Sequence, residues 1–250
     1  MDVTWLRRFG GAPQEGRARR VRLVCFPHAG GAATSFLPLS RFLGPAVDVV
    51  SVQYPGRQDR YREQPVESVT RLAELVVDAL DPADDRPYAF FGHSMGAVVA
   101  YETARRLAAR SAPGPVRLFL SGRAAPGPGP EALDRMTSDA EVIAAIRMLG
   151  GTGAGVLDDP ELMELALPAL RADYRAIGAY AWKPGPPLDC PFTVLVGDAD
   201  PVAPVARVAE WSAFTSADTD LKVFPGGHFY LDGCTAEIGD VITTALGVRV

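Results

Sequence analysis

Short apolar runs alternate along the chain with longer stretches in which apolar residues recur every three or four positions. The apolar runs are typical of buried strands and occupy residues 22–26, 47–52, 88–91, 116–120, 192–196 and 221–224. The stretches with the helical period cover residues 35–43, 66–80, 97–109, 205–214 and 236–246. Strands and helices that alternate in this way form a mainly parallel sheet with helices on both faces. The pattern therefore predicts an α/β fold.

A long insertion interrupts this alternation at residues 126–187. Its ends are rich in proline and glycine, and two helical patterns at 139–149 and 161–180 are separated by a glycine-rich stretch at 150–155. An insertion of this length greatly exceeds the usual connection between two strands, and long insertions in compact domains are usually functional. We therefore expect a helical lid over the end of the sheet, in preference to a helical hairpin packed on its edge.

Length and composition restrict the class of protein. A chain of 250 residues matches one α/β domain with a single core, so we expect one domain over residues 1–250. The net charge of −5 offers no basic surface for nucleic acid, and no run of 18 apolar residues is present to cross a membrane. The three scattered cysteines predict neither a disulfide framework nor a zinc site. We expect a soluble, cytoplasmic protein with buried, free thiols.

The strand at 88–91 leads directly into the sequence Gly92-His93-Ser94-Met95-Gly96, which fits the pattern G-x-S-x-G. A sharp strand-to-helix turn needs glycines where side chains would collide with the neighbouring strand and helix. The serine hydroxyl then stands at a helix N-terminus, which favours developing negative charge. This context indicates that Ser94 is a catalytic nucleophile rather than a residue that only caps the helix.

A serine hydroxyl needs a base to accept its proton, and the chain has three histidines. His93 adjoins the nucleophile in sequence, where its ring would point away from the hydroxyl, and His28 follows the first strand. His228 lies immediately after the last predicted strand and behind a pair of glycines, so it can reach across the end of the sheet to Ser94. We therefore predict His228 as the base.

The imidazole in turn needs a carboxylate that fixes its tautomer and stabilises its charged form. The loop after the strand at 192–196 offers Asp198 and Asp200. Asp200 is preferred because it lies further from the strand end, in the turn that Pro201 fixes, whereas Asp198 is suited to brace that turn through backbone N–H groups. The resulting order of Ser94, Asp200 and His228 is the chain order of an α/β-hydrolase triad.

Acyl transfer also needs donors for the charge that develops on the carbonyl oxygen. The backbone N–H of Met95, the residue after the nucleophile, is one predicted donor. The loop after the first strand supplies the second, for which we prefer Ala29 and keep Gly30 as the alternative. The glycines of this loop do not form a phosphate-binding motif, because the G-x-G-x-x-G spacing and a Walker lysine are missing.

Taken together and in order, seven short motifs resemble the type II, or external editing, thioesterases of polyketide synthase and nonribosomal peptide synthetase pathways. They lie at residues 5–7, 26–31, 53–57, 92–96, 170–174, 197–200 and 226–230 and span nearly the whole chain. The resemblance implies an α/β-hydrolase fold and hydrolysis of acyl groups from the phosphopantetheine arm of a carrier protein. The substrate then carries the phosphopantetheine, and no other cofactor and no metal is implied.

The expected function is that of a stand-alone, monomeric enzyme that clears aberrant or short acyl groups from acyl and peptidyl carrier domains. The alternatives are a product-releasing thioesterase or a general carboxylesterase of the same fold, and a non-catalytic carrier-binding protein that would not need a reactive Ser94. Arg57, Arg60 and Arg62 follow the second strand and form a candidate basic cluster that docks an acidic carrier protein. A solvated loop is the other interpretation of these arginines.

Overall fold

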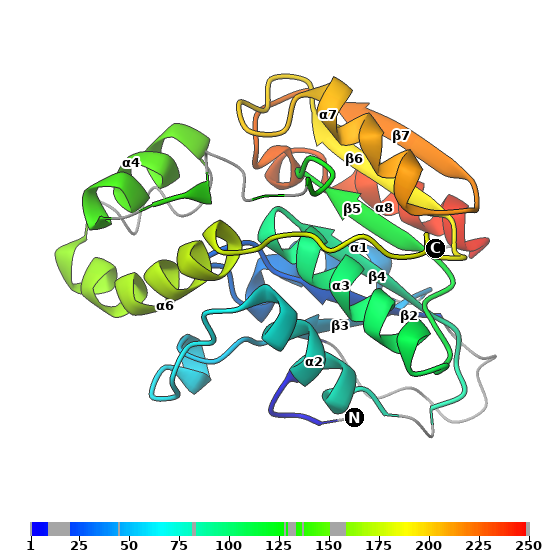
Figure 1. Ribbon diagram of the computed structural model, residues 1–250, viewed down its shortest axis with the longest axis horizontal. Helices are drawn as coiled ribbons and strands as arrows, with labels where there is room; N and C mark the ends of the chain where they lie inside the picture. The colour runs from blue at the N-terminus through cyan, green and yellow to red at the C-terminus, as the bar shows by residue number, and fades with distance from the viewer. Residues whose placement is uncertain are drawn as a thin grey trace.

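The computed structural model describes residues 2–9, 21–44, 46–81, 84–127, 129, 134–136, 138–150 and 159–248. Within these residues a seven-stranded sheet has the order β1-β3-β2-β4-β5-β6-β7. The strands are β1 (Leu6–Arg8), β2 (Arg22–Phe26), β3 (Asp48–Val52), β4 (Tyr88–His93), β5 (Leu118–Ser121), β6 (Phe192–Gly197) and β7 (Thr219–Phe224). All neighbours pair in parallel except β1, which is antiparallel to β3. The predicted α/β fold is confirmed (Figure 1).

The two edge strands differ from what the apolar pattern predicts. The pattern of apolar runs does not predict β1, which has only three residues. This strand forms by pairing with β3, for example Leu6 with Val52. The last strand, β7, is predicted as apolar, but its Leu221 and Val223 side chains are exposed. Nothing on the outer side of β7 extends the sheet within the described residues, so this strand lies at the edge.

Helices cover both faces of the sheet (Figure 1). One face carries α2 (Val69–Ala79) and α3 (Met95–Ala109), which pack against each other, and the opposite face carries the packed pair α1 (Leu37–Leu43) and α8 (Thr235–Leu246). Side chains alternate between the two layers along the inner strands, so Phe90 of β4 enters one core and Phe91 enters the other. The remaining short helices are η1 (Ala33–Phe36), η2 (Gln58–Arg60), α7 (Val205–Ala209), η4 (Glu210–Phe214) and η5 (Tyr230–Asp232).

Two further helices, α4 (Asp139–Leu149) and α6 (Pro160–Gly178), come from the insertion and lie together at one end of the molecule (Figure 1). A capping box between Ser138 and Glu141 begins α4, and the Asp159 carboxylate caps the first turn of α6. Both helices match the predicted patterns closely. The prolines and glycines at 126–130 lie partly, and the glycine-rich stretch at 150–155 mostly, outside the described residues.

All three cysteines, Cys25, Cys190 and Cys234, are buried and free, which confirms the prediction. None of the helices in the described part of the chain has the length and apolar character needed to cross a bilayer.

Candidate active site

The Ser94 turn has the strained geometry that a nucleophile elbow requires. Ser94 joins β4 to α3 with φ 54° and ψ −120°, a conformation that non-glycine residues rarely adopt. A Cβ atom on Gly96 would lie 2.0 Å from the carbonyl oxygen of Phe26, and one on Gly92 would lie 2.2 Å from the Gly96 oxygen. Both glycines are therefore needed for α3 to start so close to β2 and β4. The turn places Ser94 at the N-terminus of α3.

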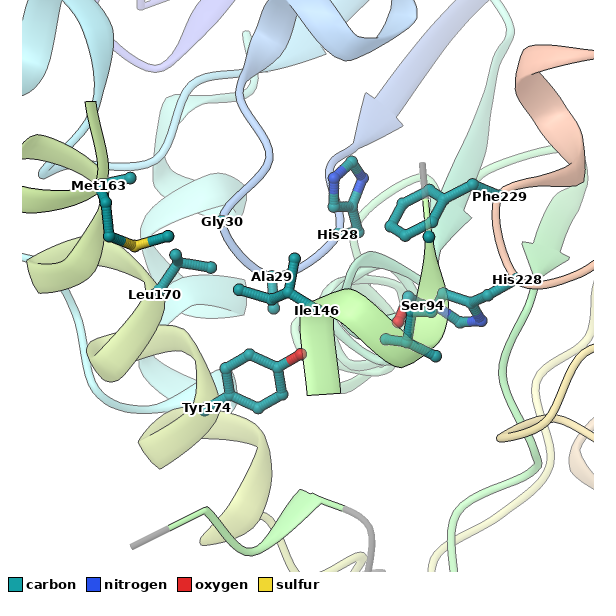
Figure 2. A pocket seen from close by; sticks show the side chains of 13 residues that line it. His28, Ala29, Gly30, Ser94, Ile146, Met163, Leu170, Tyr174, His228 and Phe229 are labelled. Carbon is teal, nitrogen blue, oxygen red and sulfur yellow. The ribbon is translucent and has the colours of Figure 1, made fainter. Parts of the chain in front are cut away.

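The structure brings the predicted base and carboxylate together. His228 Nδ1 and Asp200 Oδ2 are 2.8 Å apart, and both side chains are almost completely buried. The other oxygen, Asp200 Oδ1, accepts hydrogen bonds from the backbone N–H groups of Val202 at 3.0 Å and Ala203 at 3.2 Å. The carboxylate is thus fixed on one side and faces the imidazole on the other. Ser94 lies beside the His228 ring (Figure 2).

Asp198 has the bracing contact predicted for it. Its Oδ1 accepts a hydrogen bond of 2.9 Å from the Gly226 N–H, which ties the loop after β6 to the loop after β7. A second bond joins the same loops, because the Ala199 N–H donates to the Gly226 carbonyl at 3.0 Å. These contacts hold the loop of His228 next to the loop of Asp200. The Asp198 side chain itself is exposed.

All three histidines gather at this site, which the sequence does not indicate. The His93 ring lies 5.0 Å from His228 and 5.9 Å from His28, measured between ring centroids. A hydrogen bond of 3.0 Å joins His93 Nδ1 to the Ser121 hydroxyl, which is 2.6 Å from the Tyr230 hydroxyl. Burial, and then the neighbouring His228 and His28, hold the pKa of His93 well below its usual value. His93 is therefore a neutral group at neutral pH, next to the predicted base His228.

The oxyanion loop, residues 28–31, follows β2 and borders Ser94. The Gly30 N–H donates a hydrogen bond of 2.7 Å to Asp173 Oδ2, so Gly30 is engaged and the alternative donor is excluded. Among the described residues no acceptor is found for the N–H of Ala29 or of Met95. Ala29 and Met95 both border the cavity at Ser94. Their amides fit the predicted roles.

Ser94 lines two neighbouring cavities. The larger, of about 110 Å³, extends between the oxyanion loop and the inner sides of α4 and α6, where Ile146, Met163 and Leu170 make its wall apolar. Figure 2 shows Met163, Leu170 and Tyr174 on the side opposite His228. The smaller, of about 70 Å³, lies toward β5 and α4. No cluster of three or more metal-ligating side chains occurs in the described ranges.

This combination of fold and site has a counterpart among known proteins. The chain matches the thioesterase domain family over residues 21–244. It belongs to the thioesterase family. The thioesterase PikA5 of Streptomyces venezuelae is 48% identical over 243 residues, which cover 97% of this chain and 85% of PikA5. The protein is thus a hydrolase that acts on thioesters.

Solved thioesterase structures have the same fold. The type II thioesterase BorB from the borrelidin biosynthetic cluster superposes with a TM-score of 0.87 at 40% identity, with 98% of each chain covered. RedJ, a thioesterase of the prodiginine pathway in Streptomyces coelicolor, superposes with a TM-score of 0.80 at 42% identity, covering 88% of this chain and 89% of RedJ. The predicted α/β-hydrolase fold and the resemblance to type II thioesterases are confirmed.

The predicted basic docking cluster of this thioesterase is wrong for two of its three arginines. Arg57 and Arg60 are 7% and 5% exposed, so neither can meet a partner at the surface. Arg60 lies over the Trp5 ring at 4.4 Å and donates to the Gln53 carbonyl at 2.8 Å. Arg62 is exposed and contacts Tyr61. The three arginines are close in sequence, but the buried partners of Arg57 and Arg60 turn these two side chains inward.

Arg57 instead pairs with Asp173 of α6, which the sequence does not predict as a site residue. Its guanidinium donates to both carboxylate oxygens, at 2.7 and 2.9 Å. Burial acts to lower the pKa of Arg57, but the Asp173 carboxylate outweighs that effect and holds it above its usual value. Asp173 lies in the motif at 170–174, on which the thioesterase resemblance partly depends. That motif is the sequence signal that points to Asp173.

Proposed function

We propose that this thioesterase removes short or aberrant acyl groups from the phosphopantetheine arm of carrier proteins in polyketide or nonribosomal peptide synthesis. The observation that supports it most is the Asp200–His228 hydrogen bond beside a serine in a strained elbow. The likeness to BorB, named as a type II thioesterase of a biosynthetic cluster, supports the choice of substrate class. Both together favour acyl transfer from a thioester to water.

In the acylation half-reaction, Ser94 Oγ attacks the thioester carbonyl carbon and His228 Nε2 takes the hydroxyl proton. Asp200 accepts the Nδ1–H bond and stabilises the imidazolium that forms. The oxygen that becomes negative accepts hydrogen bonds from the N–H groups of Met95 and Ala29. When the tetrahedral intermediate collapses, the carbon–sulfur bond breaks and His228 returns its proton to the leaving sulfur. The products are an acyl-serine and the free pantetheine thiol.

In the deacylation half-reaction, water takes the place of the thiol. His228 accepts a proton from the water as its oxygen attacks the acyl-serine, and the proton then passes to Ser94 Oγ as the ester bond breaks. The acid leaves and the enzyme returns to its starting state. Side chains and backbone N–H groups of this chain, together with water, supply every step, so we propose that the reaction needs no cofactor or metal.

The apolar wall of the larger cavity suggests where the acyl group lies. Ile146 of α4 and Met163 and Leu170 of α6 line the space that extends from Ser94. We propose that the insertion at 126–187 acts as a lid whose α4 and α6 helices form this wall, and that the enzyme acts as a monomer on an acyl or peptidyl carrier domain. A carrier domain would deliver its pantetheine arm into the remaining opening at the nucleophile.

Turnover of a panel of loaded carrier proteins tests this proposal. Purified enzyme is mixed with carrier protein bearing acetyl, propionyl, malonyl or longer acyl groups, and the freed thiol is titrated. We expect wild-type enzyme to hydrolyse short acyl groups and the Ser94→Ala variant to be inactive, because removal of one member of a catalytic unit removes nearly all of its effect. A strong preference for oxygen esters without a carrier would support a carboxylesterase instead. Full activity in Ser94→Ala would overturn the mechanism.

A further inference from the structure

Two of the motifs that identify the family contribute no member of the triad, yet they meet inside the protein. The motif at 53–57 ends at Arg57, and the motif at 170–174 contains Asp173 on α6. The Arg57 and Asp173 side chains are 6% and 1% exposed and form a two-pronged ion pair. The Arg57 guanidinium also lies 5.2 Å from the centre of the buried Tyr54 ring. A planar guanidinium held on both oxygens has a defined orientation, which an exposed ion pair lacks.

The same pair is bonded to both sides of the oxyanion loop. Asp173 Oδ2 accepts a hydrogen bond of 2.7 Å from the Gly30 N–H. Arg57 Nη1 donates one of 3.0 Å to the Gly31 carbonyl. The 29–30 peptide group and the 31–32 peptide group are therefore each fixed by a charged partner, and the Ala29 N–H lies in the peptide group immediately before the first of them. Hydrogen bonds to ionised groups are the stronger class of hydrogen bonds in proteins.

A third contact seats α6 on the loop. Leu170 precedes Asp173 by three positions, so the two side chains share one side of the helix. The Leu170 Cδ2 atom lies 2.3 Å from where a Cβ on Gly30 would be, so α6 lies directly against the Gly30 backbone. The insertion therefore does more than cover the cavity, because one turn of α6 is bonded to the loop that supplies an oxyanion donor.

We propose that Arg57 and Asp173 are positioning residues: the ion pair fixes the oxyanion loop against α6, so that the Ala29 N–H is directed at the substrate carbonyl oxygen. The inference rests on the proposed function only in the role that it gives to Ala29. Neither side chain reaches the reacting atoms, and both act through the backbone of residues 29–31. A displacement of about 1 Å at a catalytic group can reduce turnover about 100-fold.

The test compares variants on a small thioester, propionyl-N-acetylcysteamine, so that carrier binding plays no part. Asp173→Asn keeps the shape of the side chain but removes its charge. Arg57→Lys keeps the positive charge but removes the guanidinium group that donates to both Asp173 oxygens. The double variant Arg57→Met with Asp173→Leu replaces the ion pair by apolar groups, which often preserves stability. Arg171→Gln is the matched control, because Arg171 lies on α6 as Asp173 does, but its ion pair with Asp139 of α4 is exposed.

Four quantities are measured: kcat, KM, the inhibition constant of a propyl trifluoromethyl ketone, and the melting temperature. The ketone forms a serine adduct that carries an oxyanion, so its affinity reports the oxyanion donors directly. We expect Asp173→Asn and the double variant to lose kcat by about 10- to 100-fold, with KM changed less than threefold. The inhibition constant should rise by a similar factor. Arg57→Lys should lie between them and wild type, and Arg171→Gln should stay within twofold.

Two results would overturn the proposal. One is an unchanged ketone affinity in the double variant, and the other is a loss of kcat that only follows the fraction of unfolded protein. Should Asp173→Asn fail to fold, the double variant and Arg57→Lys give the same readouts. Failure of the proposed function is seen separately, as wild-type enzyme that cleaves the small thioester but ignores acyl-carrier proteins, or as an active Ser94→Ala variant.

Discussion

Replacing Asp200 by asparagine should reverse the tautomer of His228, the predicted base. Asp200 Oδ1 accepts the N–H groups of Val202 and Ala203, and Oδ2 faces His228 Nδ1 at 2.8 Å. An asparagine amide has only one acceptor atom, its oxygen, and this oxygen accepts the hydrogen bonds of the Val202 and Ala203 N–H groups. Its NH2 group then faces Nδ1, which must act as an acceptor. The imidazole proton moves to Nε2, so Nε2 can no longer accept the hydroxyl proton of Ser94.

The loss in rate follows from that wrong tautomer. A catalytic triad with the same substitution loses about 10,000-fold in kcat, which corresponds to about 5 kcal/mol at 1.36 kcal/mol for each tenfold change. KM should change little, because Asp200 lines neither of the two cavities that Ser94 borders. The nearly isosteric amide retains the two backbone hydrogen bonds, so the fold should persist.

Hydrolysis of a small thioester, followed by titration of the released thiol, measures kcat and KM, and circular dichroism checks the fold. Asp198→Asn is the matched control, because Asp198 is exposed and an asparagine oxygen can still accept the Gly226 N–H. We expect this control to retain at least a third of wild-type activity. A loss of less than tenfold in Asp200→Asn, or a larger loss in Asp198→Asn than in Asp200→Asn, would refute the assignment of the carboxylate.

Three further outcomes are expected. Gly96→Ala should lower the unfolding free energy by about 3 kcal/mol or more in urea denaturation, because the new Cβ would lie 2.0 Å from a β2 carbonyl oxygen. Gly114→Ala is the control and should be neutral, since no atom lies within 4 Å of the Cβ position there. Because burial, followed by the two neighbouring histidines, depresses the pKa of His93 in the folded protein, the unfolded chain binds the extra proton below pH 6.5. The unfolding free energy should therefore fall as the pH drops from 6.5, by up to about 1.4 kcal/mol per pH unit, and His93→Gln should remove that part of the slope in denaturation curves at pH 7.5, 6.5 and 5.5. Ala166→Phe should fill the larger cavity and lower kcat/KM for octanoyl thioesters at least tenfold and for acetyl thioesters less than threefold, while Leu165→Phe, at an exposed position, changes neither. Equal losses on both thioesters would contradict an acyl site between α4 and α6.

Local patterns were sufficient wherever the chemistry is local. The elbow at 92–96 is visible because a strand, two glycines and a helix adjoin it, and Asp200 and His228 follow the ends of strands that lie side by side in a parallel sheet. The alternation of apolar runs likewise indicates six of the seven strands. The missing one, β1, has three residues and exists only through its pairing with β3, which no local pattern reveals.

Long-range partners explain the remaining failures. Arg57 looks like part of a basic surface loop until its partner Asp173, 116 positions away, is known. Arg60 is turned inward by Trp5, and His28 approaches His93 only because β2 and β4 are neighbours. Charge and spacing in one stretch of sequence do not show which side chains are paired across the fold, and pairing decides whether an arginine is a surface group or a buried brace.

The burial of all three cysteines makes site-specific labelling of this protein straightforward. Burial raises the pKa of Cys25 and raises that of Cys190 to about 12, so these thiols form little thiolate at neutral pH. A cysteine introduced at Leu165 on α6, and another at Val116 beside β5, would stand at exposed positions. A dye pair attached there would report the separation of the insertion from the sheet during turnover, in an enzyme that keeps every native residue of its core.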